Sequence, residues 1–194
     1  PKPDRRQRQM CIRDSSYTRQ REMLGLGHAI LTGRQIVGDE AFGVILADDL
    51  CLTENEAGVM SQMAEIYQQH KCSVVAIEEV PQDQVDRYGV IAGDAITEDL
   101  IKVTDMVEKP PVDAAPSNFA IIGRYVLTPD IFDILETLPP GRNGEVQITD
   151  ALMEQAKAGR VLAYKFKGRR IDCGSVEGFV EATNYCFERS RMGV

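Results

Sequence analysis

The sequence contains no tryptophan, only two histidines and no pair of cysteines spaced as C-x-x-C. His28 and His70 lie far apart in the chain, which leaves little for a histidine-based zinc site or a catalytic triad. The lack of C-x-x-C excludes a zinc ribbon and a redox motif. An odd, scattered set of cysteines suits a reducing compartment better than a disulfide framework, so we expect a cytoplasmic protein. The five cysteines are Cys11, Cys51, Cys72, Cys173 and Cys186.

Positive charge is also scarce. The chain carries 22 lysines and arginines against 30 aspartates and glutamates, a net charge of −8, and its pI is about 4.9. Nucleic acids and anionic membranes attract proteins through a positive field, so we expect neither as a partner. No apolar run approaches the roughly 20 residues that a membrane-spanning helix requires. The composition therefore predicts a soluble globular protein.

The first 23 residues differ from the rest of the chain. They hold seven basic and three acidic side chains and few residues that form a core. A solvated arm and a basic nucleic-acid arm are two interpretations. The run MCIRDSSYT also resembles translated adapter sequence at the ends of assembled environmental reads, and we favour such a foreign leader. We therefore expect one domain, over residues 24–194, because a chain of this length and 43% hydrophobic content can form a single core.

Hydrophobic patterning predicts an α/β class for this domain. The continuous apolar run at 42–47 is typical of a strand buried on both faces, and residues 73–77 form a second strand. A helix over 57–70 connects them, and a helix over 26–36 precedes them. A strand–helix–strand order with so long a crossover implies that the two strands run parallel.

The second half of the domain changes character. Three predicted strands joined by turns indicate an antiparallel or mixed extension of the sheet; they cover 88–92, 101–108 and 118–127. Helices then follow at 129–138 and 150–158, the latter with Thr149 as its N-cap and Gly159 as its stop. A strand at 160–166 precedes a closing helix, whose apolar face comprises Val176, Phe179, Val180, Thr183, Cys186 and Phe187.

Gly25 and Gly27 imitate the start of a dinucleotide-binding fingerprint. Ile30 replaces the third glycine and no clear strand precedes the pair, so a Rossmann cofactor site is disfavoured. Two interpretations stay open. The glycines either make a tight turn before a helix or let a flat ring or a phosphate approach the backbone closely.

Three aspartates are candidate metal ligands. Asp48 and Asp49 come directly after the strand at 42–47, and Asp172 lies in a short turn before the last helix. In open α/β sheets ligands bind beyond the carboxyl ends of strands, and Mg²⁺ takes one or two carboxylates together with phosphate oxygens. A magnesium site and a purely structural role as strand exit or helix cap both remain possible interpretations.

Three further groups carry candidate chemistry. Glu108 and Lys109 end a strand next to two prolines, where the carboxylate can accept hydroxyls and the ammonium can neutralise phosphate. Arg169 and Arg170 either meet phosphate or are simply solvated. Cys173 has no evident base partner, which favours a small packing residue over a nucleophile.

Seven motifs, taken in order, resemble one family. They are LGLGHA (24–29), LADDL (46–50), YGV (88–90), VEKP (107–110), SNFAIIGRYVL (117–127), EVQITDAL (145–152) and DCG (172–174). In this order they resemble the bacterial UTP–glucose-1-phosphate uridylyltransferases, which belong to the sugar-phosphate nucleotidyltransferases. The resemblance covers residues 24–194.

The resemblance implies a nucleotide-diphospho-sugar transferase fold, which is a Rossmann-like α/β fold with a mixed, mostly parallel sheet flanked by helices. It implies formation of UDP-glucose and pyrophosphate from UTP and glucose 1-phosphate with Mg²⁺, by in-line attack of a sugar-phosphate oxygen on the α-phosphorus. It also implies a homo-oligomer. For the nucleotide it implies that Gly25 and Gly27 lie beside the uracil, and that Asp48 and Asp172 hold the metal on the reacting phosphates. For the sugar phosphate it implies that Gly89 lies beside the glucose, Glu108 accepts its hydroxyls and Lys109 contacts its phosphate. Asn118 and Ile121 are further candidates on the sugar side. The resemblance treats Asp49 as variable.

One family feature has no counterpart in this sequence. The glycine-rich G-x-G-T-R loop and its P-K-E-M segment, which cradle the triphosphate in that family, do not occur. We therefore expect an N-terminally truncated member with little or no turnover. The alternatives are a nucleotidyltransferase of different base specificity, a non-catalytic sugar-nucleotide-binding module, and an unstable fragment with an exposed sheet edge.

Overall fold

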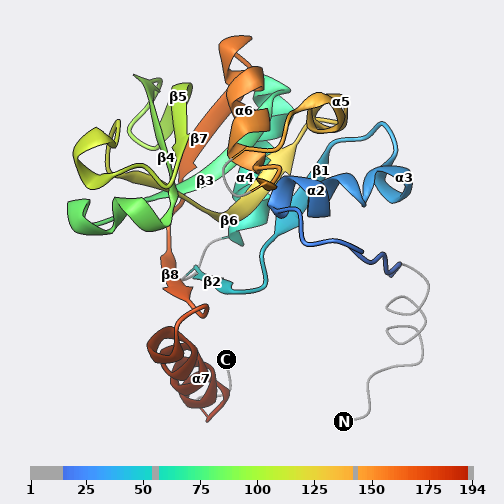
Figure 1. Ribbon diagram of the computed structural model, residues 1–194. Coiled ribbons are helices and arrows are strands. Elements are labelled where there is room, and N and C mark those ends of the chain that lie inside the picture. Colours follow the sequence, from blue (N-terminus) through green and yellow to red (C-terminus); the bar gives the residue numbers. More distant parts are fainter. Residues whose placement is uncertain (1–14, 54–56, 142–143, 192–194) are drawn as a thin grey trace.

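The computed structural model of the chain describes residues 15–53, 57–141 and 144–191, so residues 1–14 of the predicted leader lie outside the described residues (Figure 1). The α-helices are α2 (Leu26–Leu31), α3 (Arg34–Val37), α4 (Val59–His70), α5 (Ile131–Thr137), α6 (Ile148–Lys157) and α7 (Val176–Arg191). The strands are β1 (Phe42–Ile45), β2 (Asp49–Leu52), β3 (Ser73–Glu79), β4 (Gly89–Ala95), β5 (Leu100–Glu108), β6 (Phe119–Leu127), β7 (Val161–Lys165) and β8 (Arg169–Asp172).

The central sheet has six strands in the order β1-β6-β3-β7-β5-β4. Strands β3 and β7 pair in parallel, whereas the other neighbouring strands pair antiparallel. It follows that β1, β3, β4 and β7 run in one direction and β5 and β6 in the other. The mixed α/β class is thus confirmed. Four of the six strands point the same way, but among the described residues only β3 and β7 are hydrogen-bonded to each other in parallel.

Strand β1 differs from the prediction of a strand buried on both faces. It lies at the edge of the six-stranded sheet, and its exposure alternates, so that Gly43 and Ile45 are exposed. It runs in the same direction as β3, as predicted, but β6 lies between them. The reason is that β6 is nine residues long and almost wholly buried, which suits the interior position better than the four residues of β1.

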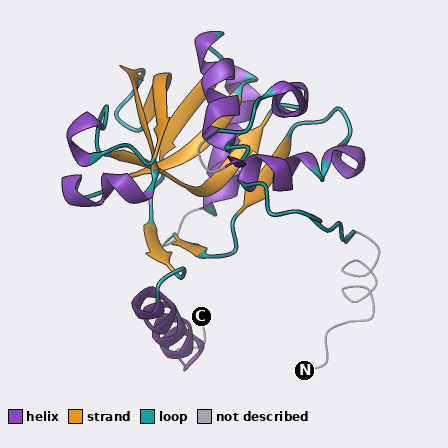
Figure 2. Cartoon of the chain, in the orientation of Figure 1, coloured by secondary structure: helices purple, strands orange, loops and turns teal. Residues whose placement is uncertain are grey.

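Helices cover both faces of the sheet (Figure 2). Val75 and Ile77 of β3 belong to a core shared with α2, α5 and α6. Val74 and Ala76, which alternate with them, pack with α4 on the opposite face. The continuous apolar run in β3 is therefore the signature of a strand covered on both sides.

The two-stranded β2–β8 ribbon and α7 extend away from this body (Figure 1). The helix is present as predicted, but its apolar face is not buried: Val176 is 77% exposed, Phe179 63% and Phe187 60%. The α7 residues that are buried, among those described, are Gly178 and Ala182. No helix in the described ranges is both long and apolar enough to cross a membrane.

Candidate functional site

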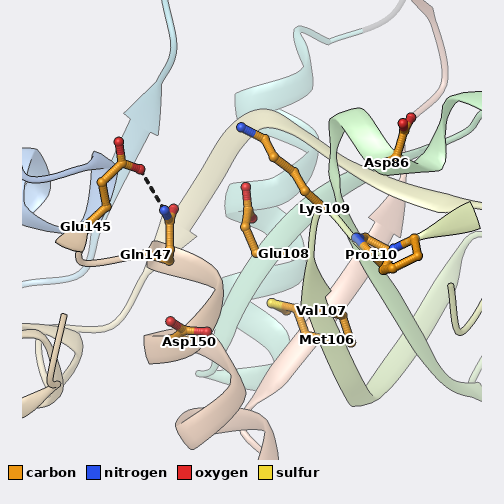
Figure 3. Close-up of a pocket in the computed structure, with 10 residues that line it drawn as sticks. Asp86, Met106, Val107, Glu108, Lys109, Pro110, Glu145, Gln147 and Asp150 are labelled. Carbon is orange, nitrogen blue, oxygen red and sulfur yellow. Dashed lines mark hydrogen bonds between the residues drawn. The ribbon is translucent and has the colours of Figure 1, made fainter. Parts of the chain in front are cut away.

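A cleft of about 480 Å³ opens where β1, β5 and β8 end and where β4 and α6 begin. Seven of the predicted site residues line this cleft: Gly25, Asp48, Gly89, Glu108, Lys109, Ile121 and Asp172. A second hollow of about 680 Å³ shares Glu108 and Lys109 with it (Figure 3). Residues that are up to 147 positions apart in sequence therefore meet around one space.

Gly25 reaches the cleft because the chain before α2 pairs with the segment before α6. The amide of Val146 donates to the carbonyl of Leu24 (2.7 Å), and the amide of Gly27 donates to the carbonyl of Val146 (2.9 Å). Gly25 has φ +93°, and a Cβ there would lie 2.9 Å from Cβ of Glu145. A glycine is thus required for this turn.

Gly27 has a different environment from Gly25. It is buried, and a Cβ there would lie 2.8 Å from Cδ2 of Leu135 in α5. It does not line the cleft. The carbonyl oxygen of Val146 would be nearer still to that Cβ, at 2.7 Å, so Gly27 lets α2 pack closely against both Val146 and α5.

Gly89 and Glu108 are directly opposite each other on β4 and β5. A Cβ on Gly89 would lie 2.8 Å from Cγ2 of Thr149 and 3.1 Å from Oε2 of Glu108, so only glycine leaves this wall of the cleft open. The Thr149 hydroxyl donates to Oε2 of Glu108 (3.1 Å). Burial raises the pKa of Glu108 above its ordinary value, although Thr149 and Lys109 oppose the shift.

Lys109 has φ +47°, which turns the chain sharply at the end of β5. Its amide donates to the carbonyl of Tyr88 (2.9 Å), which fixes this turn against the start of β4. No carboxylate in the described part of the chain forms an ion pair with its ammonium. Figure 3 shows Lys109 and Glu108 extending into the same space, with Glu145 and Gln147 across it. An ammonium and a carboxylate are thereby available together to one ligand.

Asp48 and Asp172 form the other end of the cleft. The amide of Cys173 donates to the carbonyl of Asp48 (2.7 Å), which joins the two segments. A Cβ on Gly174 would lie 3.0 Å from Oδ1 of Asp172 and 3.7 Å from Oδ2 of Asp48, so the two carboxylates border one small open space. Among the described residues, no cluster of three or more His, Cys, Asp and Glu side chains is arranged for a metal. Two carboxylates nevertheless match the ligand set of Mg²⁺ when phosphate supplies further oxygens.

Asp49, unlike its exposed neighbour Asp48, is buried and paired. Its Oδ2 accepts from the amide of Gly123 in β6 (2.7 Å), and its Oδ1 accepts from Nε of Arg170. The Arg170 side chain is only 8% exposed. Burial alone would lower the pKa of Arg170, but the contacts with Tyr88 and Asp49 outweigh it and raise the pKa. Asp49 therefore anchors the β2–β8 ribbon to the sheet.

Asn118 does not line the cleft. It directly precedes β6, and its carbonyl accepts from the amide of Val80 (3.0 Å). Ile121, three residues further along, does line the cleft and would touch a Cβ on Gly89.

Residues 5–189 match the nucleotidyl transferase family. The chain belongs to this family.

Relatives within the nucleotidyl transferase family agree with this assignment. A UTP–glucose-1-phosphate uridylyltransferase from Pseudomonas aeruginosa is 62% identical over 173 residues, which are 89% of this chain and 62% of that protein. One from Staphylococcus epidermidis is 45% identical over 86% of this chain and 57% of its own length. A solved UDP-glucose pyrophosphorylase in complex with UDP-glucose superimposes with a TM-score of 0.87 at 56% identity, covering 90% of this chain and 66% of that one. The chain thus spans less than two thirds of these relatives.

Two features of this cleft were not predicted. Thr149 is not the N-cap of α6: the helix begins at Ile148 after Gln147, and Thr149 in its first turn contacts Glu108 instead. The tertiary contact thus replaces the local capping bond. The role of Arg170 was left open, although R-R-I-D on a strand places Arg170 and Asp172 on the same face.

Proposed function

We propose that this protein binds UTP, glucose 1-phosphate and UDP-glucose, and acts in the uridylyl transfer that interconverts them. The observation that carries the proposal is the convergence of Gly25, the two aspartates Asp48 and Asp172, and the Glu108–Lys109 pair on one cleft. The names of the relatives support the choice of substrates.

The residues of the cleft fit separate parts of such a ligand. Glu108 accepts hydrogen bonds from sugar hydroxyls, and Thr149 holds its carboxylate in place. Lys109, free of a described carboxylate partner, neutralises the sugar phosphate. The backbone at Gly25 lies against the flat base, and Gly89 leaves room for the sugar ring. Orientation of the two substrates is the main contribution expected of these groups.

Asp48 and Asp172 fit Mg²⁺ because their carboxylates border the open space beside Gly174. When bound, the ion supplies charge neutralisation to the phosphate oxygens. The transfer itself needs no covalent enzyme intermediate. A phosphate oxygen of glucose 1-phosphate forms a bond to the α-phosphorus of UTP, and the bond to the pyrophosphate leaving group breaks.

The reaction can be tested with UTP, glucose 1-phosphate and Mg²⁺, with UDP-glucose and pyrophosphate quantified by chromatography. We expect product formation with the unaltered chain and none with Asp172→Asn. Replacing UTP with TTP in a parallel reaction tests base choice. Absence of product, or failure of the folded chain to bind UDP-glucose, would contradict the proposal.

We also propose action in the cytoplasm, which the free thiols of Cys51, Cys72, Cys173 and Cys186 support.

Self-association is proposed as well, and the exposed apolar face of α7 supports it. This helix carries Glu177 in its first turn and Arg189 and Arg191 in its last, so two antiparallel copies would bring opposite charges together. In sedimentation velocity we expect a dimer for the unaltered chain and a monomer for Phe179→Ser combined with Phe187→Ser. Val112→Ser, another exposed apolar position, serves as the control. A monomeric unaltered chain would contradict this proposal.

A further inference from the structure

Arg170 lines the cleft at the end formed by Asp48 and Asp172, and it lies among the charged groups there. Its guanidinium contacts Oδ1 of Asp49, Oδ2 of Asp172 (3.2 Å) and Oε2 of Glu78 (3.5 Å). It also lies over the ring of Tyr88, 5.1 Å from the ring centroid. One buried side chain thus joins β2, β3, β8 and the start of β4.

The register of the β2–β8 ribbon explains why a cation is needed there. Asp49 and Asp172 are direct partners across the antiparallel pair, and like charges opposite each other are destabilising. Arg170 lies two residues before Asp172 on the same strand face and reaches both carboxylates. The planar guanidinium can contact several oxygens at once, whereas an ammonium on a flexible chain holds no such fixed geometry.

Tyr88 extends this connection to the sugar side of the cleft. Its hydroxyl donates to Oδ2 of Asp172 (3.4 Å) and accepts from NH1 of Arg170 (3.5 Å). Its carbonyl accepts from the amide of Lys109 (2.9 Å), and the next residue is Gly89. A continuous set of contacts therefore runs from the metal carboxylate through Arg170 and Tyr88 to the residues expected to hold the sugar phosphate.

We propose that Arg170, together with Tyr88, is a positioning residue that fixes the Asp172 carboxylate for cation binding and sets its place relative to Lys109. This inference rests on the proposed function for the identity of the ligand, but the cation-binding part can be measured alone. Its neighbour Arg169 has no such role, because it points to α7 and pairs with Glu181. Outer partners that orient a metal ligand typically contribute about 10–100-fold to metal affinity.

The test is a calorimetric titration of the whole chain with terbium(III), a cation that takes oxygen ligands, without nucleotide. The cleft-specific component is the binding that Asp172→Asn removes. We expect Arg170→Lys, which keeps the charge, to weaken this component by about tenfold or more. Arg169→Lys, on the same strand, is the matched control and should bind as the unaltered chain does. Thermal melts establish that each variant folds.

Tyr88→Phe keeps the ring beneath the guanidinium and removes only the hydroxyl. We expect Tyr88→Phe to weaken terbium(III) binding severalfold. If Arg170→Lys gives no cooperative melt, Tyr88→Phe tests the positioning role in its place. Unchanged or tighter binding in the folded variants, an equal loss in Arg169→Lys, or no Asp172-dependent binding in the unaltered chain would overturn the proposal. A parallel titration with UDP-glucose separates the two ideas: if the terbium(III) results hold and UDP-glucose does not bind, the proposed function fails and the positioning role stands.

Discussion

At the scale of single residues, the Glu108 carboxylate destabilises the fold that holds it. Burial raises its pKa above the ordinary value of 4.5, so the folded protein favours the protonated form. The stability that this shift contributes is complete below the ordinary pKa and is lost as the pH rises through the raised pKa. Ionisation of the partly buried Glu108 therefore costs the folded protein stability as the pH rises through the raised pKa.

We predict that Glu108→Gln raises the thermal midpoint at pH 7 by roughly 2–4 °C. The amide oxygen can still accept from Thr149, so the charge is removed while this hydrogen bond is kept. The gain should shrink towards pH 4, where Glu108 is protonated, and UDP-glucose binding should weaken. Melts of both proteins across this pH range check the prediction, and an equal midpoint at every pH would contradict it.

Asp48 and Asp49 provide a second comparison at this scale. Asp49→Asn should destabilise the protein by about 3–5 kcal/mol, because it leaves the buried guanidinium of Arg170 with less compensation. Asp48→Asn removes an exposed carboxylate and should leave stability almost unchanged while it weakens cation binding. Urea unfolding of the two variants measures the difference. Equal stabilities would show that the Asp49–Arg170 pair is not an anchor.

The sequence predicted the residue types of the cleft but not every role. Asp48 follows β1, Glu108 ends β5 with Lys109 directly after it, and Asp172 ends β8, a strand that was not predicted. Because β5 runs opposite to β1, a shared carboxyl edge of parallel strands does not explain why these residues meet. They meet because β1 ends and β4 begins along the same strand, β6. Asp48 and Asp49 are adjacent, so the sequence pattern around them is the same and does not tell their roles apart. What distinguishes Asp49 is an arginine 121 positions away, which no local pattern shows.

At the scale of elements, the position of Asp172 depends on how closely α7 follows β8. A Cβ on Gly178 would lie 1.8 Å from the carbonyl oxygen of Asp172, a distance at which backbone atoms must move. Gly178 is one of the few buried residues of this helix. The start of α7 is therefore packed directly against the end of β8, so the two move together.

We predict that Gly178→Ala displaces α7, lowers the thermal midpoint and weakens Asp172-dependent cation binding. Gly58→Ala is the matched control, because a Cβ there meets nothing within 4 Å and its φ of −57° suits alanine. Because Gly58 is the N-cap of α4, where alanine is less favoured than glycine, the control should cost about 1 kcal/mol and leave cation binding unchanged. Thermal melts and the terbium(III) titration measure both effects; a neutral Gly178→Ala would contradict the described packing.

The periodicity of the sequence predicted which segments form helices and strands, but it did not predict which elements lie next to one another. The alternation within β3 and the helical spacing in α4 and α6 are local properties of the sequence. Strand β1 lies at the edge because the longer β6 takes the interior position of the sheet. Helix α7 is exposed because the chain leaves the main body of the protein at β8. Both are decided by contacts between distant segments.

At the scale of the whole molecule, the central claim is that the cleft binds a sugar nucleotide through its two ends. Glu108 and Lys109 form one end, and Asp48 and Asp172 form the other. A ligand that spans both ends and binds only the folded state should stabilise the whole chain by about 2.7 kcal/mol at 100 times its dissociation constant. The effect should depend on the cation.

The most direct measurement is the thermal midpoint of the chain with UDP-glucose, with and without Mg²⁺. It is compared with Asp48→Asn, Asp172→Asn and the distant, exposed control Asp94→Asn. We predict a Mg²⁺-dependent rise of about 2–4 °C for each kcal/mol of stabilisation, which both cleft variants lose and Asp94→Asn keeps. A cooperative melt with no shift, or a shift that the cleft variants retain, would contradict the claim that these carboxylates and this cleft bind the sugar nucleotide.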